Sequence, residues 1–388
     1  MTTISRPECY HGGAFFSAIG DEFDQLERAS TIISADVLDA WFPPSPQVTA
    51  AIAEHLEWLV RTSPPTGCEG LIRTIARMRD VDESCILAGG GSSDLIFLAL
   101  TRWLDVTSRV LILDPMYGEY AHVLEQVVGC QVDRFTLPRE DDYDLDVVEL
   151  SRRMQHGSYD LVILVNPNSP TGRHCPAAQM RWLLDRVPAD TRVWIDETYV
   201  EYAGEGESLE RDAVSRDNVI VCKSMSKVYA LSGVRAAYLC GAPDLIEELR
   251  PLCPPWAVSL PAQVAACEAL SSVDYYAARW SETHALRAAL RAGLEALGWD
   301  VVPGVANFLL CHLPEDGPTA ADVVESSRRR GVFVREVGNM GTRFGPRVLR
   351  VAVKDELTNH RMLEILSAAT GTRASRLRAN EGSASGGR

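Results

Sequence analysis

Between residues 86 and 240 the chain alternates short apolar segments with segments of helical character. The apolar segments lie at 86–87, 110–113, 161–165, 192–195, 219–222 and 237–240, and helical patterns fill most of the gaps between them. Short apolar strands that alternate with helices are typical of a parallel sheet covered on both faces. The sequence therefore predicts an α/β fold with a mostly parallel, doubly wound sheet.

The segments on either side of this region predict further elements. Helices are expected near 21–28, at 46–60 and up to about residue 79, with a proline-rich extended segment at 36–46. After residue 299, strands at 301–302, 306–311, 332–334 and 349–353 and helices at 320–330 and 357–369 indicate a smaller α+β domain. We divide the 388 residues into an N-terminal arm and small-domain segment (1–45), a large domain (46–255), a small C-terminal domain (256–370) and a disordered, Gly/Ser-rich tail (371–388).

Composition excludes several classes of protein. The formal net charge of −15 argues against a nucleic-acid partner and against an anionic membrane surface. The chain has no run of about 18 apolar residues and no secretory signal, so we expect a cytoplasmic protein. Its ten cysteines are scattered singly and lack metal-ligand spacing, which predicts reduced core cysteines and no metal site.

Polar motifs follow the predicted strands at the points where these strands end. Ligand sites of open α/β sheets lie outside the carboxyl ends of the strands. Gly89-Gly-Gly-Ser-Ser-Asp94 opens a predicted helix, whose free N–H groups could bind a phosphate, although such loops are also common without a ligand. The aromatic ring of Tyr117, just past a strand, could stack on a flat cofactor or simply pack a loop.

Two further strand ends carry candidate groups. Residues 166–172 are rich in turn formers, a pattern that needs no function. Asp196 ends an apolar strand in the sequence Asp196-Glu-Thr-Tyr199, and a buried carboxylate must have a partner. That partner could be a protonated pyridine nitrogen or an ordinary structural salt bridge.

The segment 221–235 holds two of the only three lysines in the protein, Lys223 and Lys227; the third is Lys354. Chemistry that needs an amine nucleophile therefore has few candidates. Lys227 follows a buried strand, lies among serines and precedes Arg235, although a solvated helix lysine would be the usual interpretation. Our working hypothesis is that Lys227 forms a Schiff base with pyridoxal 5'-phosphate.

Together these motifs resemble one known family. The order Gly-rich loop, Pro-x-Tyr, Asn-Pro-x-x-Pro-Thr-Gly, Asp-Glu-x-Tyr and Ser-x-Ser-Lys-x-x-x-Leu-x-Gly-x-Arg resembles the fold-type I pyridoxal phosphate enzymes. Within them it is most similar to the class I/II aminotransferases of the histidinol-phosphate aminotransferase branch, over roughly residues 34–370. The resemblance implies a small domain built from both ends of the chain, an amino acid substrate and a homodimer with the active site at the subunit interface.

The resemblance also implies a role for each matching residue. Lys227 is implied to be the Schiff-base lysine and proton shuttle, Asp196 the partner of the pyridine N–H, and Tyr199 the donor to the ring 3-oxygen. The remaining cofactor contacts are implied to come from Gly91, Ser92, Ser93, Tyr117, Asn168, Ser169, Ser224, Ser226 and Arg235. Arg350 matches the arginine that binds the substrate carboxylate, and Asn307, Trp41 and Phe42 are further candidates for substrate contact.

The sequence departs from the family pattern in three places. Ser169 stands where the family has asparagine, Ser63 or a neighbour stands where it has tyrosine, and Asp39-Ala-Trp-Phe-Pro-Pro replaces its Asn-Glu-Asn-Pro segment. These changes point to a substrate other than histidinol phosphate. They also leave open an alternative, a pyridoxal phosphate enzyme of specialised metabolism that performs elimination, addition, decarboxylation or cyclisation. A non-catalytic sensor is disfavoured, because too few residues precede the motifs for a DNA-binding module.

Overall fold

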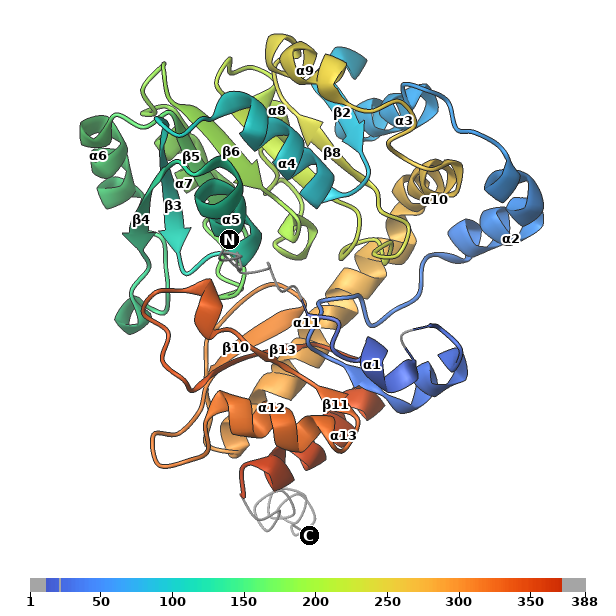
Figure 1. Ribbon diagram of the computed structural model, residues 1–388, viewed down its shortest axis with the longest axis vertical. Coiled ribbons are helices and arrows are strands. Elements are labelled where there is room, and N and C mark those ends of the chain that lie inside the picture. The colour runs from blue at the N-terminus through green and yellow to red at the C-terminus, as the bar shows by residue number, and fades with distance from the viewer. Residues whose placement is uncertain (1–11, 21, 372–388) are drawn as a thin grey trace, which may run out of the picture.

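The computed structural model describes residues 12–20 and 22–371, and their strands form sheets of seven, four and two strands (Figure 1). The larger sheet has seven strands in the order β2-β8-β7-β6-β5-β3-β4. These strands are β2 (Ile86–Gly89), β3 (Arg109–Asp114), β4 (Gln131–Thr136), β5 (Leu161–Val165), β6 (Arg192–Asp196), β7 (Val219–Ser224) and β8 (Ala237–Cys240). Strands β4, β3, β5, β6 and β7 pair in parallel, and β8 is antiparallel to both of its neighbours. The predicted α/β class with a mostly parallel sheet is confirmed.

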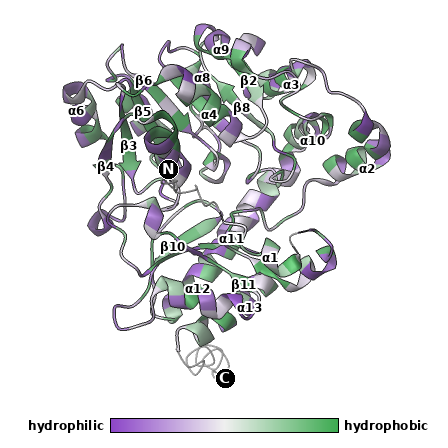
Figure 2. Ribbon diagram, in the orientation of Figure 1, coloured by the Kyte–Doolittle hydropathy of each residue, from purple (hydrophilic) through white to green (hydrophobic). Residues whose placement is uncertain are grey.

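The strands of this sheet are continuous apolar runs because helices cover both faces. Every residue of β5 and β7 is buried, and the hydropathy colouring shows the strands as predominantly hydrophobic (Figure 2). Strand β4, which the sequence analysis missed, lies at the edge of the sheet and is only half-buried. Its polar composition follows from that position, because an edge strand needs no second apolar face.

The helices between residues 46 and 271 are mostly those that the sequence predicts. They are α2 (Pro46–Arg61), α3 (Glu69–Arg79), α4 (Ser92–Trp103), α5 (Gly118–His122) with a π-helical continuation (Val123–Val128), α6 (Val147–Gly157), α7 (Ala177–Leu184), α8 (Glu210–Ala213), α9 (Pro243–Leu249) and α10 (Leu260–Ser271). Ser45 caps α2 by accepting from the backbone N–H of Val48, with Pro46 in the first turn. Helix α4 begins directly after Gly91, so Ser92 and Ser93 belong to its first turn.

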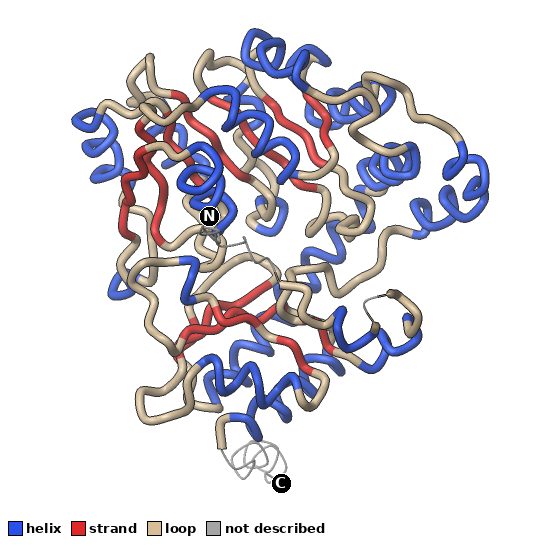
Figure 3. The backbone as a smooth tube through the Cα atoms, in the orientation of Figure 1, coloured by secondary structure: helices blue, strands red, loops and turns tan. Residues whose placement is uncertain are grey.

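The second part of the structure is a four-stranded sheet in the order β12-β13-β10-β9 with helices α12 (Ala320–Arg328) and α13 (Glu356–Ala369). Its strands are antiparallel: β9 (Asp300–Val301), β10 (Phe308–His312), β12 (Arg335–Glu336) and β13 (Val348–Ala352). The short strand β12 was not predicted. The long helix α11 (Val273–Ala296) runs from the larger sheet to the smaller one, and the two groups of strands stand apart in Figure 3.

The N-terminal segment packs with this second part. Strand β1 (Ile33–Ser34) pairs in parallel with β11 (Val332–Phe333), so segments from both ends of the chain build it, as expected. The helix expected at 21–28 is wrong, because the described residues form α1 (Phe16–Ile19) and a 3-10 helix (Leu26–Thr31) instead. The tail expected to be disordered lies outside the described residues except for Gly371. The domain boundaries stay a prediction, and no helix of the described ranges is long and apolar enough to span a bilayer.

A cluster of buried charged side chains surrounds Lys223, a residue of strand β7 in the larger sheet. Its Nζ lies 2.8 Å from Oε1 of Glu201, 3.6 Å from Oε2 of Glu197 and 4.0 Å from Oε2 of Glu210. Arg79, the last residue of α3, lies 3.2 Å from Glu201 and 3.5 Å from Glu210. The Lys223 side chain is only 2% exposed, so each carboxylate depends on these two cations for compensation.

We therefore expect Lys223→Met to lower the free energy of unfolding by about 3–5 kcal/mol, because it leaves buried carboxylates without compensation. Urea denaturation measures this change. As a control, Arg291→Met removes an exposed ion pair with Glu295 on α11 and should cost about 1 kcal/mol or less. Equal urea midpoints for Lys223→Met and the wild type would contradict the proposed role of the cluster.

Candidate active site

A cavity of about 260 Å³ lies at the carboxyl ends of the parallel strands, where the larger sheet faces the smaller one. Its lining comes from both parts of the structure, which places most of the predicted site residues together. The lining residues are Val37, Leu38, Ser92, Ser93, Tyr117, Val165, Ser169, Asp196, Thr198, Tyr199, Ser224, Ser226, Lys227, Arg235, Arg335, Met340 and Arg350.

One end of the cavity is formed by the N-terminus of α4. Gly91 precedes this helix with φ of +112°, and a Cβ built on it would lie 2.3 Å from Nη2 of Arg235. The guanidinium of Arg235 therefore lies against the start of a twelve-residue helix, beside the hydroxyls of Ser92 and Ser93. Free N–H groups, hydroxyls and a cation that converge in this way form a site for a phosphate group.

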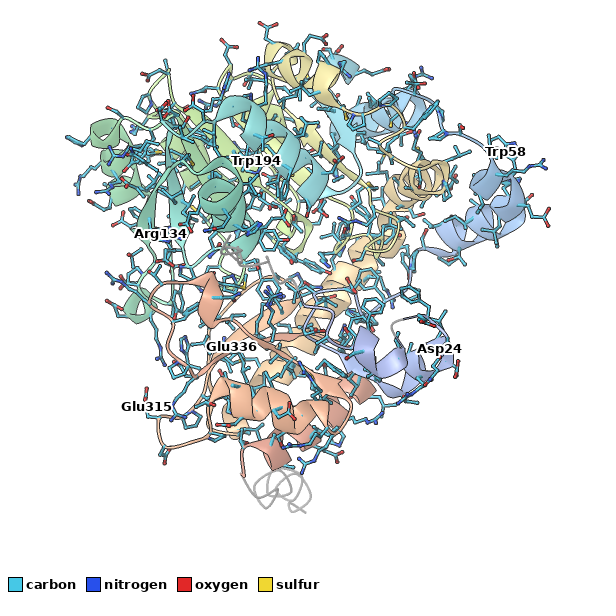
Figure 4. The ribbon with its side chains drawn as sticks, viewed as in Figure 1. Asp24, Trp58, Arg134, Trp194, Glu315 and Glu336 are labelled. Atoms are coloured by element: carbon cyan, nitrogen blue, oxygen red, sulfur yellow. The ribbon has the colours of Figure 1, made fainter. Side chains whose placement is uncertain are left out.

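Asp196 forms the floor of the cavity at the end of β6, and its carboxylate is buried. Its Oδ1 accepts from the backbone N–H of Thr198 at 2.9 Å and from the Thr198 hydroxyl at 2.6 Å. Its Oδ2 accepts from the Tyr120 hydroxyl at 2.8 Å, which in turn accepts from Nε1 of Trp194 at 2.7 Å. Trp194 lies among the strands of the larger sheet (Figure 4).

The electrostatic position of Asp196 favours a cationic partner. Burial raises the pKa of its carboxyl, while the hydrogen bonds from Thr198 and Tyr120 act in the opposite direction. Among the residues that the structure describes, none forms an ion pair with it. A protonated ring nitrogen in the cavity would therefore compensate a buried carboxylate that the protein itself only hydrogen-bonds. The supporting residues Tyr120 and Thr198 were missed by the sequence analysis, because only the fold brings Tyr120 to Asp196.

Lys227 reaches the cavity, whereas Lys223 points into the buried cluster of glutamates. The Lys227 Nζ lies 2.9 Å from Oδ1 of Asp39 and 3.4 Å from the Ser232 hydroxyl. Burial is the largest effect on the pKa of Lys227 and lowers it; nearby Arg350 lowers it further, and Asp39 acts in the opposite direction. Asp39 was noted in the sequence only as part of an unusual segment.

Arg350 enters the cavity from β13 and is buried. Its Nη1 donates to the Ser169 hydroxyl and its Nη2 to the backbone carbonyl of Asp36, both at 3.2 Å. Burial lowers the pKa of its guanidinium to about 10. Arg335 on β12 pairs with Arg350 across the antiparallel strands and also lines the cavity; the sequence analysis missed it because β12 was not predicted.

Two tyrosines complete the lining between the two ends of the cavity. Tyr199 is buried, its ring lies 5.2 Å from that of Phe308, and burial raises the pKa of its hydroxyl. Tyr117 precedes α5, and its ring centroid lies 6.0 Å from that of Tyr120. The ring of Tyr117 is thus in reach of a flat group held above Asp196.

Five residues that were expected in the site are not among those that line the cavity, and the first of them, Gly91, lies directly before Ser92 at the start of α4. Asn168 donates to the Pro115 carbonyl and to Thr171 within the turn, and Asn307 donates to the Leu38 carbonyl at 2.9 Å. Trp41 donates from Nε1 to the Thr283 hydroxyl at 2.8 Å, and Phe42 packs in the core with its ring 6.3 Å from Tyr276. Trp41 and Phe42 therefore fix the entry to α2 against α11, and their expected substrate contacts stay a prediction.

The fold and the cavity define an α/β enzyme with a lysine amine, a buried carboxylate and a phosphate-binding helix start in one site. Residues 42–368 match the family of class I and II aminotransferases, and the chain belongs to this family. It is thus an aminotransferase that uses pyridoxal phosphate, and the alternative reaction classes are not favoured.

Curated relatives and solved structures agree with this assignment. The chain is 31% identical over 330 residues to a histidinol-phosphate aminotransferase of Symbiobacterium thermophilum, covering 84% of this chain and 88% of the relative. It is 33% identical to that of an Anaeromyxobacter strain, with the same shares covered. The histidinol-phosphate aminotransferase structure from Sinorhizobium meliloti, in complex with pyridoxal-5'-phosphate, shares the fold with a TM-score of 0.79 at 20% identity, covering 93% of this chain and 98% of that one.

We expect Gly91→Ala to weaken pyridoxal phosphate binding by at least about tenfold. The added Cβ would meet Arg235, and φ of +112° is unfavourable for alanine. A titration of protein fluorescence with the cofactor measures the affinity. The matched control is Gly70→Ala in α3, where nothing lies within 4 Å of the added atom and where affinity should not change. Equal affinities for both variants would contradict a phosphate site at Gly91.

Proposed function

We propose that this aminotransferase acts on an amino acid or related amine that carries an anionic group, with pyridoxal phosphate held in the cavity described above. The observation that carries the proposal is the presence of the Lys227 amine and the buried Arg350 guanidinium in one cavity with the buried carboxylate of Asp196. These groups come from different elements, and each is costly to bury without a ligand that uses it.

The cofactor would be held at three points. The N-terminus of α4 with Ser92 and Ser93, together with Ser224, Ser226 and Arg235, would bind its phosphate. Asp196 would pair with the ring nitrogen, Tyr199 would donate to the ring oxygen, and Tyr117 would stack on the ring. Ser169 would stand beside the ring oxygen in place of the family's asparagine, with Asn168 shaping the turn. When bound, the cofactor supplies an electron sink for the carbon that bears the amino group.

Lys227 would bind the cofactor covalently and move the proton of the reacting carbon. A lysine acts as a base only as the neutral amine. Burial and the positive charges of Arg350 and Arg235 lower its pKa, which increases the neutral fraction near neutral pH. The side chain is 22% exposed and faces the cavity, so it can reach a substrate bound there.

The other end of the cavity would select the substrate. Arg350 presents its guanidinium to the cavity from the smaller sheet, and Arg335 lies beside it. Two arginines in one partly closed site favour a substrate with a carboxylate or a phosphate group. The relatives described above are named histidinol-phosphate aminotransferases. Histidinol phosphate carries a phosphate group, so it is a candidate substrate together with α-amino acids.

The decisive experiment incubates the pyridoxal phosphate form of the enzyme with α-amino acids, with histidinol phosphate and with simple amines that lack an anionic group. We expect the pyridoxamine form and an oxo product from one of the anionic substrates, and none from the simple amines. Lys227→Ala should reduce the rate by at least about 10²-fold, because it removes the proton-transfer group. Absorption spectra and mass spectrometry follow both products.

Three results would oppose the proposal. Reaction of simple amines at the same rate would contradict the proposal that Arg350 and Arg335 bind an anionic group of the substrate. Product formation without any pyridoxamine form would indicate elimination, decarboxylation or another reaction of the alternative class. Retention of full activity by Lys227→Ala would exclude Lys227 as the reacting amine.

The enzyme is further proposed to work as a homodimer in the cytoplasm, without a nucleic-acid partner. Phe97 on α4 is 39% exposed, Leu252 at the end of the 3-10 helix Arg250–Leu252 is 45% exposed, and Trp256 in the loop that follows is 55% exposed. This loop reaches the start of α4, because the Ala257 carbonyl lies 2.9 Å from a Cβ built on Gly90. The exposed apolar residues therefore lie close to the cavity, where a second subunit would cover them. The nine described cysteines are all unpaired, which suits a reducing compartment.

We expect sedimentation equilibrium to give a mass of twice the 42.6 kDa chain, and Trp256→Asp to shift the protein toward monomer by placing a charge in the covered surface. Leu357→Asp on α13, also highly exposed but far along the chain from this surface, is the control. A wild-type protein that stays monomeric at micromolar concentration would contradict the homodimer.

A further inference from the structure

The ion pair between Lys227 and Asp39 joins two segments that are far apart in the sequence. Asp39 belongs to the extended segment between β1 and α2, and its Oδ1 lies 2.9 Å from the Lys227 Nζ. The Ser232 hydroxyl lies 3.4 Å from the same nitrogen and itself donates to the Ser226 carbonyl at 3.1 Å. The amine of Lys227 is therefore held on the side of the cavity that the N-terminal segment forms.

The backbone around Asp39 is fixed by contacts on both sides. Asn307 Nδ2 donates to the carbonyl of Leu38 at 2.9 Å, and Lys354 Nζ donates to the carbonyl of Asp39 itself at 3.3 Å. Trp41, two residues further, is bound to Thr283 on α11. The segment around Asp39 is thus hydrogen-bonded to Asn307, Lys354 and Thr283. These contacts fix the position from which the Asp39 carboxylate reaches Lys227.

The charges around Lys227 make Asp39 its essential counter-ion. Arg350 from β13 and Arg235 from the segment before β8 both disfavour the charged amine, as does burial. Lys354, which follows β13, is a further positive charge that interacts with Lys227. Asp196 lines the same cavity, but its hydrogen bonds go to Thr198 and Tyr120. Without Asp39, the Lys227 ammonium would face three cations.

We propose that Asp39 is a positioning residue that holds the Lys227 amine as an ammonium whenever this amine is not attached to the cofactor, and so sets the pH at which it becomes neutral. The proposal rests on the proposed function for its role in turnover, because cofactor capture and proton transfer both require the neutral amine. It adds a second determinant of reactivity, from the N-terminal segment, to the burial that the cavity imposes.

The small number of lysines permits a direct test on the full-length chain freed of cofactor. Trace acetylation with acetic anhydride reacts only with neutral amines, and peptide mass spectrometry can resolve Lys227 from Lys223 and Lys354, with the α-amino group as an internal reference. In Asp39→Asn we expect the midpoint of Lys227 acetylation to move to lower pH by about one unit, which is about a tenfold larger neutral fraction at a given pH below the midpoint. The acid limb of cofactor capture should move in the same direction.

The direction follows from the charges. An anion beside an ammonium favours the protonated form, so its replacement by a neutral amide lowers the pKa of the amine. Asparagine keeps the size of the side chain and the backbone carbonyl that binds Lys354. Asp39→Ser, a shorter neutral side chain, should give the same shift and guards against a distortion specific to asparagine.

The matched control is Asp355→Asn. Asp355 follows Lys354 and caps α13 through the N–H of Thr358, a position where asparagine caps equally well, so the charge change is the same without loss of structure. In Asp355→Asn, the pH midpoint of Lys227 acetylation should equal that of the wild type. An unshifted midpoint in both Asp39 variants would overturn the proposal even if the enzyme transaminates, whereas a shifted midpoint in an enzyme without transaminase activity would leave the ion pair standing and refute the proposed function instead.

Discussion

The parallel register of β5, β6 and β7 is the constraint on which the site depends. Val165 pairs with Asp196, and Asp196 pairs with Cys222, so β5 and β6 end at one level of the sheet and β7 ends two residues beyond it. Because the strands run in the same direction, the residues that follow them must leave the sheet on the same side. Ser169 and Lys227 thereby reach one cavity although 58 positions separate them in the chain.

The same strand end gives two lysines opposite environments. Lys223 is the fifth residue of β7, and the three glutamates around it raise its pKa above the ordinary value. Lys227 lies four residues later, where burial and two arginines lower its pKa, and among the described residues Asp39 alone forms an ion pair with it. A buried cation is stable where anions outnumber it and reactive where cations surround it. Lys223 is thus placed for a structural role, and Lys227 has the environment that the proposed chemistry requires.

Much of the larger sheet could be predicted from the sequence because its strands are buried on both faces, and such strands are continuous apolar runs. The strand ends could be predicted as well, because the apolar runs stop where the strands end. Strand β4 could not, since an edge strand that is half-exposed looks like a loop in composition. Tyr120, Arg335 and Asp39 were missed because nothing local marks them. Tyr120 reaches Asp196, Asp39 reaches Lys227 and Arg335 reaches the cavity only through packing between segments distant in the sequence. Trp41 and Phe42 show the converse, since these conspicuous aromatic residues pack the segment before α2 against α11.

The shape of the cavity depends on the position of the larger sheet relative to the smaller one. Lys227 and Asp196 belong to the larger sheet, whereas Arg350 belongs to the smaller one and Asp39 to the segment that joins β1 with α2. Beyond α11, the two parts are joined across the cavity edge, where Met116 N–H donates to the Met340 carbonyl at 3.0 Å and Thr342 N–H donates to Asp114 at 2.9 Å. A displacement of about 1 Å between reacting groups can cost on the order of 10²-fold in rate. These contacts between the two parts therefore matter for the proposed mechanism, because they set the distance between the Lys227 amine and the Arg350 guanidinium.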